Sequence, residues 1–99
     1  MNRRRSLDRD TAESLAIQAL GYLAAEPARL GRFLALCGLE PGEIRGAAAE
    51  PGFLAGVLEY LNCDESLLLA FADQASVDPA DLGRAQAILS ADRRERESP

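Results

Sequence analysis

The chain has no histidine, no lysine and no tryptophan among its 99 residues. Histidine is the usual general base, and lysine supplies Schiff-base amines and phosphate contacts, so the commonest catalytic and nucleotide-binding side chains are missing. The sequence also lacks a Gly-rich phosphate loop and an Asp-rich calcium loop. We therefore expect a protein that is not an enzyme, with no catalytic residue and no cofactor, metal or small-molecule ligand.

Cysteine is scarce, with only Cys37 and Cys63. Neither has another cysteine or a histidine at metal-ligand spacing, which speaks against a metal site. A reactive thiolate needs positive charge nearby, and the surrounding sequence is acidic. Each cysteine falls near the end of a predicted helix, so we expect both to serve as small buried hydrophobic residues.

Long hydrophobic runs are also absent. No apolar stretch approaches the roughly 18 residues of a membrane-spanning helix. The arginines at positions 3–5 are followed by charged residues rather than by the apolar stretch of a secretory signal. Hydrophobic residues nevertheless make up 47% of the chain and charged residues 27%, which is typical of globular proteins. We expect a cytoplasmic protein with no membrane contact.

Basic residues are few in the middle of the chain. Residues 11–90 hold four arginines against eleven acidic residues, a net charge of −7. A body of this charge repels phosphate, so nucleic acid is not an expected partner. The other arginines lie near the two ends. We expect a single helical domain over residues 11–91 between two disordered charged tails, an Arg-rich one over 1–10 and another over 92–99.

What the chain does contain is a self-match at a shift of 38 residues. Both tyrosines and two of the three phenylalanines fall in register. The matched pairs are Tyr22 with Tyr60, Phe33 with Phe71, Leu20 with Leu58, Leu23 with Leu61, Leu30 with Leu68, and Pro41 with Pro79. Such a match predicts a repeated supersecondary unit, here residues 11–50 and residues 51–91.

Local signals divide each unit into three helices. A proline behind an acidic residue marks a helix start at Pro27, Pro41, Pro51 and Pro79, and Asp10 or Thr11 is the expected cap of the first helix. Gly38 and Asn62 are residue types of left-handed C-caps. No alternating apolar pattern predicts a strand. The predicted fold is all-α, a compact six-helix orthogonal bundle of two pseudo-repeated three-helix units.

The predicted fifth helix carries three consecutive leucines, Leu67 to Leu69. At about 100° per residue they cover about 200° of the helix surface, more than one stripe buries. This helix is therefore either the central, all-round buried element or has an apolar side for another chain. In the second case Leu67 or Leu69, with Phe53 or Leu54, forms a candidate surface for a protein partner or for self-association.

These observations favour a small non-catalytic module for protein–protein interaction or adaptor function. The alternative is a DNA-binding or transcription-associated regulator derived from a helix-turn-helix. The residues that fit its spacing are Ala72, Ser76, Val77, Leu82 and Ala85, and in the first unit Leu34, Gly38, Leu39, Ile44 and Ala47. Any tight helical hairpin satisfies that spacing. The predicted recognition helices begin with acidic residues, which repel phosphate.

Three segments also resemble a known family. They are residues 13–20 (ESLAIQAL), 29–36 (RLGRFLAL) and 64–71 (DESLLLAF). They are similar to small alphaproteobacterial proteins recorded only as a domain of unknown function, and the likeness covers about residues 12–90. The resemblance implies a bacterial cytoplasmic protein. It implies no activity, cofactor or catalytic residue.

Overall fold

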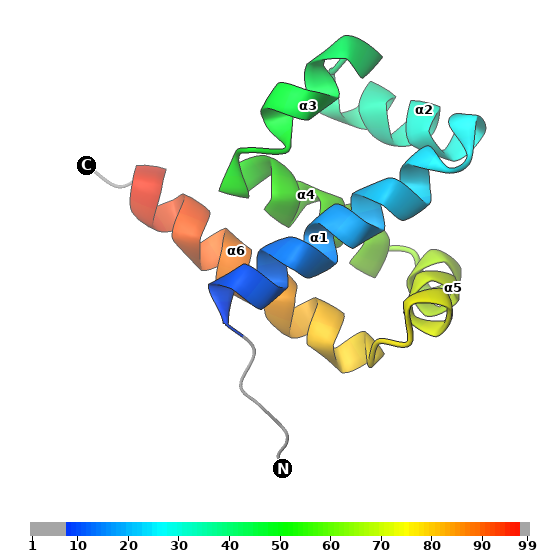
Figure 1. Ribbon diagram of the computed structural model, residues 1–99. Helices are drawn as coiled ribbons and strands as arrows, with labels where there is room; N and C mark the ends of the chain where they lie inside the picture. The colour runs from blue at the N-terminus through cyan, green and yellow to red at the C-terminus, as the bar shows by residue number, and fades with distance from the viewer. Residues whose placement is uncertain (1–7, 98–99) are drawn as a thin grey trace.

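The computed structural model describes the backbone of residues 8–97 and, within it, the side chains of residues 8–50 and 52–91; every regular element in that stretch is helical. The elements are α1 (Arg9–Ala24), α2 (Pro27–Cys37), the short 3₁₀ helix η1 (Pro41–Glu43), α3 (Ile44–Ala47), α4 (Pro51–Asn62), α5 (Glu65–Ala75) and α6 (Pro79–Glu97) (Figure 1). The predicted all-α bundle of six helices is confirmed.

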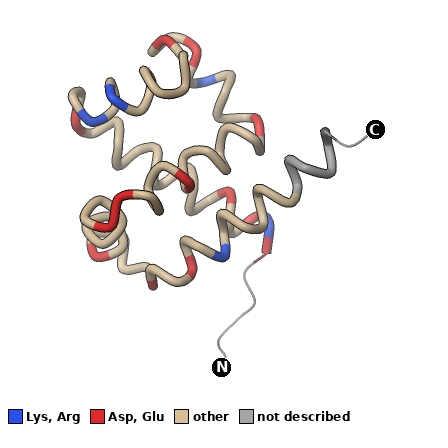
Figure 2. The backbone as a smooth tube through the Cα atoms, turned by 180° about the vertical axis from the view of Figure 1, so that it is seen from behind, with Lys and Arg blue, Asp and Glu red and all other residues tan. Residues whose placement is uncertain are grey.

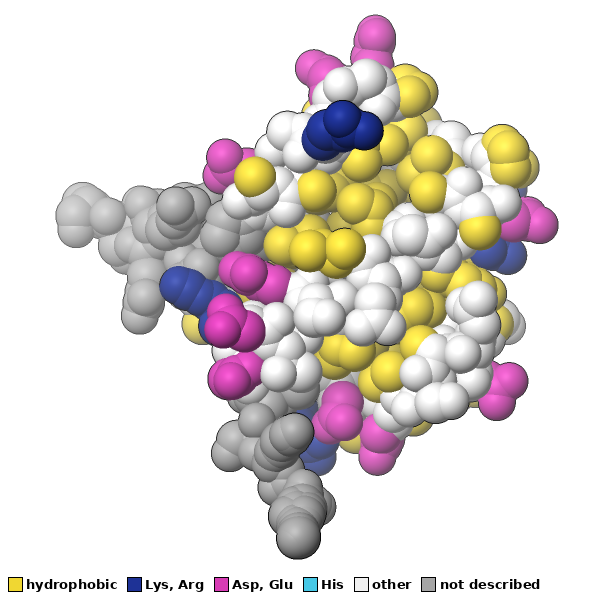
Figure 3. All heavy atoms as spheres, viewed as in Figure 1, with side chains coloured by type: hydrophobic (Ala, Val, Ile, Leu, Met, Phe, Trp, Pro, Cys, Tyr) yellow, Lys and Arg dark blue, Asp and Glu magenta, His cyan; other side chains and the backbone are white. Residues whose placement is uncertain are grey.

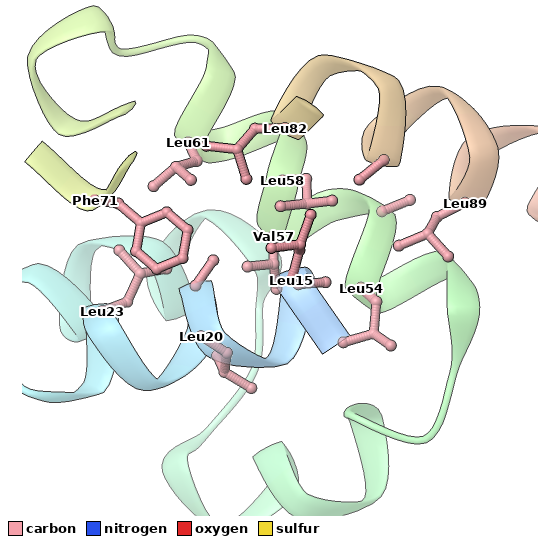
Figure 4. Packing of buried hydrophobic residues seen from close by; sticks show 14 of the residues in the cluster. Leu15, Leu20, Leu23, Leu54, Val57, Leu58, Leu61, Phe71, Leu82 and Leu89 are labelled. Carbon is pink, nitrogen blue, oxygen red and sulfur yellow. The ribbon is translucent and has the colours of Figure 1, made fainter. Parts of the chain in front are cut away.

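The central helix is α4, which packs against α6, α1 and α5. Its buried residues meet those of α1 and α6 in one apolar core (Figure 4). The fully or nearly fully buried members from α4 are Leu54, Ala55, Val57, Leu58 and Leu61. Of the two alternatives for the fifth helix, the central, all-round buried element is wrong, because α5 lies at the edge of the bundle and buries only Phe71 and Ala72.

Helix starts follow the predicted chemistry closely. Proline opens α2, η1, α4 and α6, where a missing backbone N–H costs nothing. The cap of α1 is Asp8 rather than Asp10 or Thr11, because the Asp8 carboxylate accepts the Thr11 backbone N–H at 2.8 Å. The helix therefore begins at Arg9, inside the predicted N-terminal tail, whose first seven residues lie outside the described part of the chain.

Helix ends are less well predicted. Gly38 caps α2 with φ 72°, as expected of glycine in the left-handed region. Asn62 is not a left-handed cap. It is the last residue of α4, and its side chain instead donates to the Leu82 carbonyl (3.4 Å) and to Gln86 Oε1 (2.7 Å) on α6. The second left-handed cap is Ser76, with φ 58°.

The last helix is longer than expected. α6 continues through residues 92–97, which the sequence analysis placed in a disordered tail. These residues are mostly Arg and Glu, which are good helix formers, and no Gly or Pro interrupts them before Pro99. The domain boundary at residue 91 stays a prediction, and residues 98–99 lie outside the described part.

Both cysteines are exposed and free, so the expectation of buried side chains is wrong. Cys37 is the last residue of α2, and Cys63 is the residue after α4. At a helix end the chain is already turning away from the core, so a position that continues the apolar stripe is open to solvent.

The two units correspond closely up to their third helices. α2 and α5 each have eleven residues and end in the same pattern, with Leu39 N–H donating to Leu34 O (3.1 Å) and Val77 N–H donating to Ala72 O (2.9 Å). By contrast, α3 has four residues and α6 has nineteen. The 38-residue repeat itself stays a prediction, since agreement of helix bounds does not establish a duplication.

Aromatic rings tie the two units together. The ring of Tyr22 lies 5.5 Å from that of Phe71, and the ring of Phe33 lies 5.1 Å from that of Tyr60. Each pair joins a tyrosine of one unit to a phenylalanine of the other, and both are tilted, at 55° and 59°. Tilted pairs at this separation are a favourable aromatic geometry.

Candidate interaction surface

The structure does not gather the four predicted surface residues into one exposed patch. Leu54 is 3% exposed and belongs to the core. Phe53 is partly buried, with its ring 5.8 Å from that of Phe33 on α2. Leu67 is partly buried against the core, and only Leu69 is largely exposed, at 47%. Leu67 and Leu69 are two residues apart, so they project from opposite flanks of α5.

Two exposed aliphatic residues were not singled out from the sequence. They are Ile17 on α1, 52% exposed, and Leu36 on α2, 75% exposed. A signal for Ile17 was available, because it falls outside the apolar stripe of Leu15, Ala19 and Leu23 on the same helix. An isolated exposed leucine such as Leu36 is common on protein surfaces and carries no message by itself.

Ile17 is part of a stripe along one flank of α1. Glu13, Ile17, Leu20 and Ala24 recur at spacings of three and four residues and so lie above one another. Leu20, at the inner edge of the stripe, points toward the side on which α3 lies (Figure 4). Ile17 and Ala24 are on the outer, exposed edge.

On the other side of this stripe is α3, whose apolar side chains are only partly buried. Ile44, Ala47 and Ala48 all have intermediate exposure, and Ile44 and Ala48 pack against the core. We call the surface formed by Ile17, Ile44 and Ala47, with the buried Leu20 at its inner edge, the α1–α3 face. Figure 3 shows hydrophobic side chains gathered on this side of the molecule, with acidic side chains toward the edges and one basic side chain over the upper part of the hydrophobic area.

The second unit shows what the corresponding positions look like when covered. Shifted by 38 residues, Ile17 and Leu20 correspond to Ala55 and Leu58, which are 1% and 0% exposed. Asn62, two turns after Ala55 on the same flank of α4, bonds to α6, so this flank faces α6. On α1, Leu20 is likewise buried, at 8% exposure, whereas Ile17 is 52% exposed and is not covered by the four-residue α3.

Acidic residues outnumber basic ones around the α1–α3 face. They occupy the first turns of α1 and the two ends of the η1–α3 segment, and Figure 2 shows how few basic residues the described chain carries. The acidic residues are Asp10, Glu13, Glu40, Glu43 and Glu50, and the basic ones are Arg9 and Arg45. Glu43 is held in place, since its carboxylate accepts the Glu40 backbone N–H at 2.9 Å.

Residues 9–92 match the family model described as a protein of unknown function (DUF3572). The chain belongs to this family. The match runs from the first residue of α1 into the charged end of α6 and confirms the resemblance to a domain of unknown function. No curated protein and no solved structure matches the chain.

Among the side chains that the structure describes in this DUF3572 member, no three of His, Cys, Asp or Glu come together as metal ligands would. Partial burial raises the pKa of the Cys37 thiol, which disfavours the nucleophilic thiolate. None of the described helices combines the length and the apolar composition needed to cross a bilayer.

The helices that would read DNA in a helix-turn-helix also make internal contacts. In the second unit α6 packs along α4 and α1, its Arg84 forms an ion pair with Asp81, and its Gln86 accepts the Asn62 amide. In the first unit the corresponding α3 has four residues, too few to lie along a major groove.

Proposed function

We propose that this DUF3572 member is a non-catalytic interaction module that binds a partner protein through its α1–α3 face. One observation carries the proposal. Ile17 is 52% exposed on an apolar flank of α1, whereas Ala55 in the corresponding place on α4 is 1% exposed beneath α6.

The energetics are compatible with a surface used in binding. Fully burying an aliphatic side chain contributes about 1.5–3 kcal/mol, so covering the exposed half of Ile17 contributes about 1 kcal/mol. Ile44 and Ala47 each keep part of their surface in solvent and add to this on contact. Several partly covered apolar residues side by side favour a binding face over a scattering of single exposed side chains.

The proposal that the protein is not a catalyst rests on the types of side chain in the sequence and on the positions of its acidic residues. It has no histidine or lysine. Its acidic residues mostly stand at helix starts, where they complement the positive end of the helix dipole and cap backbone N–H groups, as Asp8 and Asp64 do. Such roles are structural and need no substrate.

The test is co-purification of tagged wild type and two variants from cells that naturally produce the protein. Ile17→Asp places a charge on the α1–α3 face, and Leu36→Asp places the same charge on an exposed leucine of α2. We expect a partner protein that is retained by wild type and by Leu36→Asp and lost from Ile17→Asp. The same set of proteins on all three baits would contradict the proposal.

Circular dichroism of both variants checks folding. Because Ile17 and Leu36 are both largely exposed, neither substitution removes a core contact, and both variants should keep the wild-type helical spectrum. A partner lost only from a folded Ile17→Asp then reports on the surface rather than on stability.

A further inference from the structure

One helix, α6, covers the flank of α4, and its buried residues follow a regular helical spacing. Leu82, Ala85 and Leu89 of α6 are fully buried, at spacings of three and four residues, which is one face of a helix. Polar residues such as Arg84 remain on the outer side. The α1 flank has the same stripe spacing, with Leu20 buried and with Ile17 and Ala24 exposed at its outer edge.

We infer that the α1–α3 face receives one amphipathic helix of a partner protein, lying along α1 much as α6 lies along α4, with Lys or Arg on its flanks. This inference rests on the proposed function and names the partner's chemistry. A helix in an apolar groove is recognised through residues at i, i+3 and i+7, which matches the stripe of α1.

The basic flanks follow from charge. The elements that form the face, α1 and the η1–α3 segment, carry the acidic residues Asp10, Glu13, Glu40 and Glu43, and the whole chain has a net charge of −5. Opposite charges at the rim steer the encounter and select among apolar helices, while like charges oppose it. A second copy of this chain brings the same negative charge to the contact, so a basic partner is favoured over self-association.

The probe is a fluorescein-labelled peptide with the sequence of residues 79–91 of this chain, carrying Asp81→Lys, Gly83→Lys and Ala87→Lys. Leu82, Ala85 and Leu89 are kept as the apolar face. The matched control peptide carries Asp81→Glu, Gly83→Glu and Ala87→Glu. Anisotropy titrations with the full chain measure the affinity of each peptide, and backbone amide NMR shifts locate the site.

We expect the Lys peptide to bind at least tenfold more tightly than the Glu peptide and to lose affinity as salt is added. Ile17→Asp should weaken the Lys peptide about tenfold, and Leu36→Asp should leave its affinity unchanged. The amide shifts should fall on α1 and α3. Equal affinity of the two peptides, indifference to Ile17→Asp, or shifts confined to α5 and α6 would overturn the inference.

A second pair of variants distinguishes loss of the binding face from loss of folding in Ile17→Asp. Ala24→Arg adds a bulky positive charge at the exposed end of the same stripe, and Ala35→Arg adds it at an exposed position of α2. Ala24→Arg should weaken the Lys peptide about tenfold, while Ala35→Arg should not. Sedimentation of the chain alone adds another check, since a dimer that Ile17→Asp dissociates would identify a second copy as the occupant and overturn the inference.

The outcomes separate this inference from the proposed function. If a partner is lost from the Ile17→Asp bait but the Lys peptide does not bind, the interaction module stands and the basic helix is wrong. If no protein depends on Ile17 in the co-purification and no peptide binds, both are wrong.

Discussion

The first and second units share their first two helices and differ in the third. α3 has four residues and leaves Ile44 and Ala47 partly exposed, whereas α6 has nineteen and buries the corresponding Leu82 and Ala85 completely. Two matching apolar patterns therefore give different surfaces. Matching apolar residue types therefore do not by themselves fix the exposure of Ile44, Ala47 and their counterparts Leu82 and Ala85.

The cause of the difference lies in the connection. After α3 the chain must turn within three residues so that α4 can begin at Pro51, and a proline at that place prevents α3 from continuing as one helix into α4. After Leu89 no such turn is needed, and α6 runs on.

The largest effect on the free energy of unfolding is expected for Leu82→Ala, which we compare with Ile44→Ala at the corresponding position of the first unit. Leu82 is fully buried, so its truncation should lower the free energy of unfolding by about 2–5 kcal/mol. Ile44 is partly exposed, and the same truncation should cost about half as much or less. Urea denaturation followed by circular dichroism measures both. Equal losses would break the comparison between the units.

A smaller effect is expected from Asn62→Ala, which removes two hydrogen bonds between α4 and α6. We expect the free energy of unfolding to fall by about 1–2 kcal/mol, because Gln86 then loses its partly buried partner. The matched change in the first unit is Ala24→Asn, where no covering helix is present, and it should cost less than about 0.5 kcal/mol. A large loss for Ala24→Asn would mean that α3 interacts with this flank more than the structure indicates.

The two left-handed caps offer a reciprocal exchange. Gly38→Ala should lower the free energy of unfolding by about 1 kcal/mol, because a Cβ is disfavoured at φ 72° although nothing lies within 4 Å of it. Ser76→Gly should raise it by up to about 1 kcal/mol, since φ 58° suits glycine better than serine. Thermal melts of both variants test the pair. Shifts of the same sign would show that the caps are not equivalent.

The smallest effect concerns Cys37, at the end of α2. Partial burial raises the pKa of its thiol, so less thiolate is present at a given pH below that value and alkylation is slower. In a Cys63→Ala background, the pH at which iodoacetamide reacts at half its maximal rate should lie higher for folded protein than for protein in urea. A lower midpoint in the folded state would contradict the partial desolvation of this thiol, which lies on an otherwise exposed residue.

Local chemistry made much of the fold predictable from the sequence. Proline at the first helical position and Gly38 at a helix end act through their own backbone, so their effect does not depend on distant residues. The buried stripe containing Leu20 and Leu23 follows from helical periodicity. These signals give the number of helices and most of their bounds.

What the sequence did not predict depends on contacts between helices. Asn62 has the residue type of a left-handed cap, but two partners on α6 hold it inside the helix. Ser76 takes the left-handed conformation that its residue type disfavours. The exposure of Ile17 depends on where α3 stops, which its own neighbours along α1 do not encode. The sequence therefore predicts a candidate surface on α5, whereas the packing favours one on α1 around Ile17.

The crossed aromatic pairs carry a consequence for how the chain can be divided. Tyr22 finds its ring partner beyond the α3–α4 connection, and so does Phe33. Cleavage at that connection would separate both ring pairs, and it would expose the buried apolar side chains of each fragment to water. The two fragments should be unstructured when separate and should regain their helices on mixing. Each half of the chain would then fold only in contact with the other half.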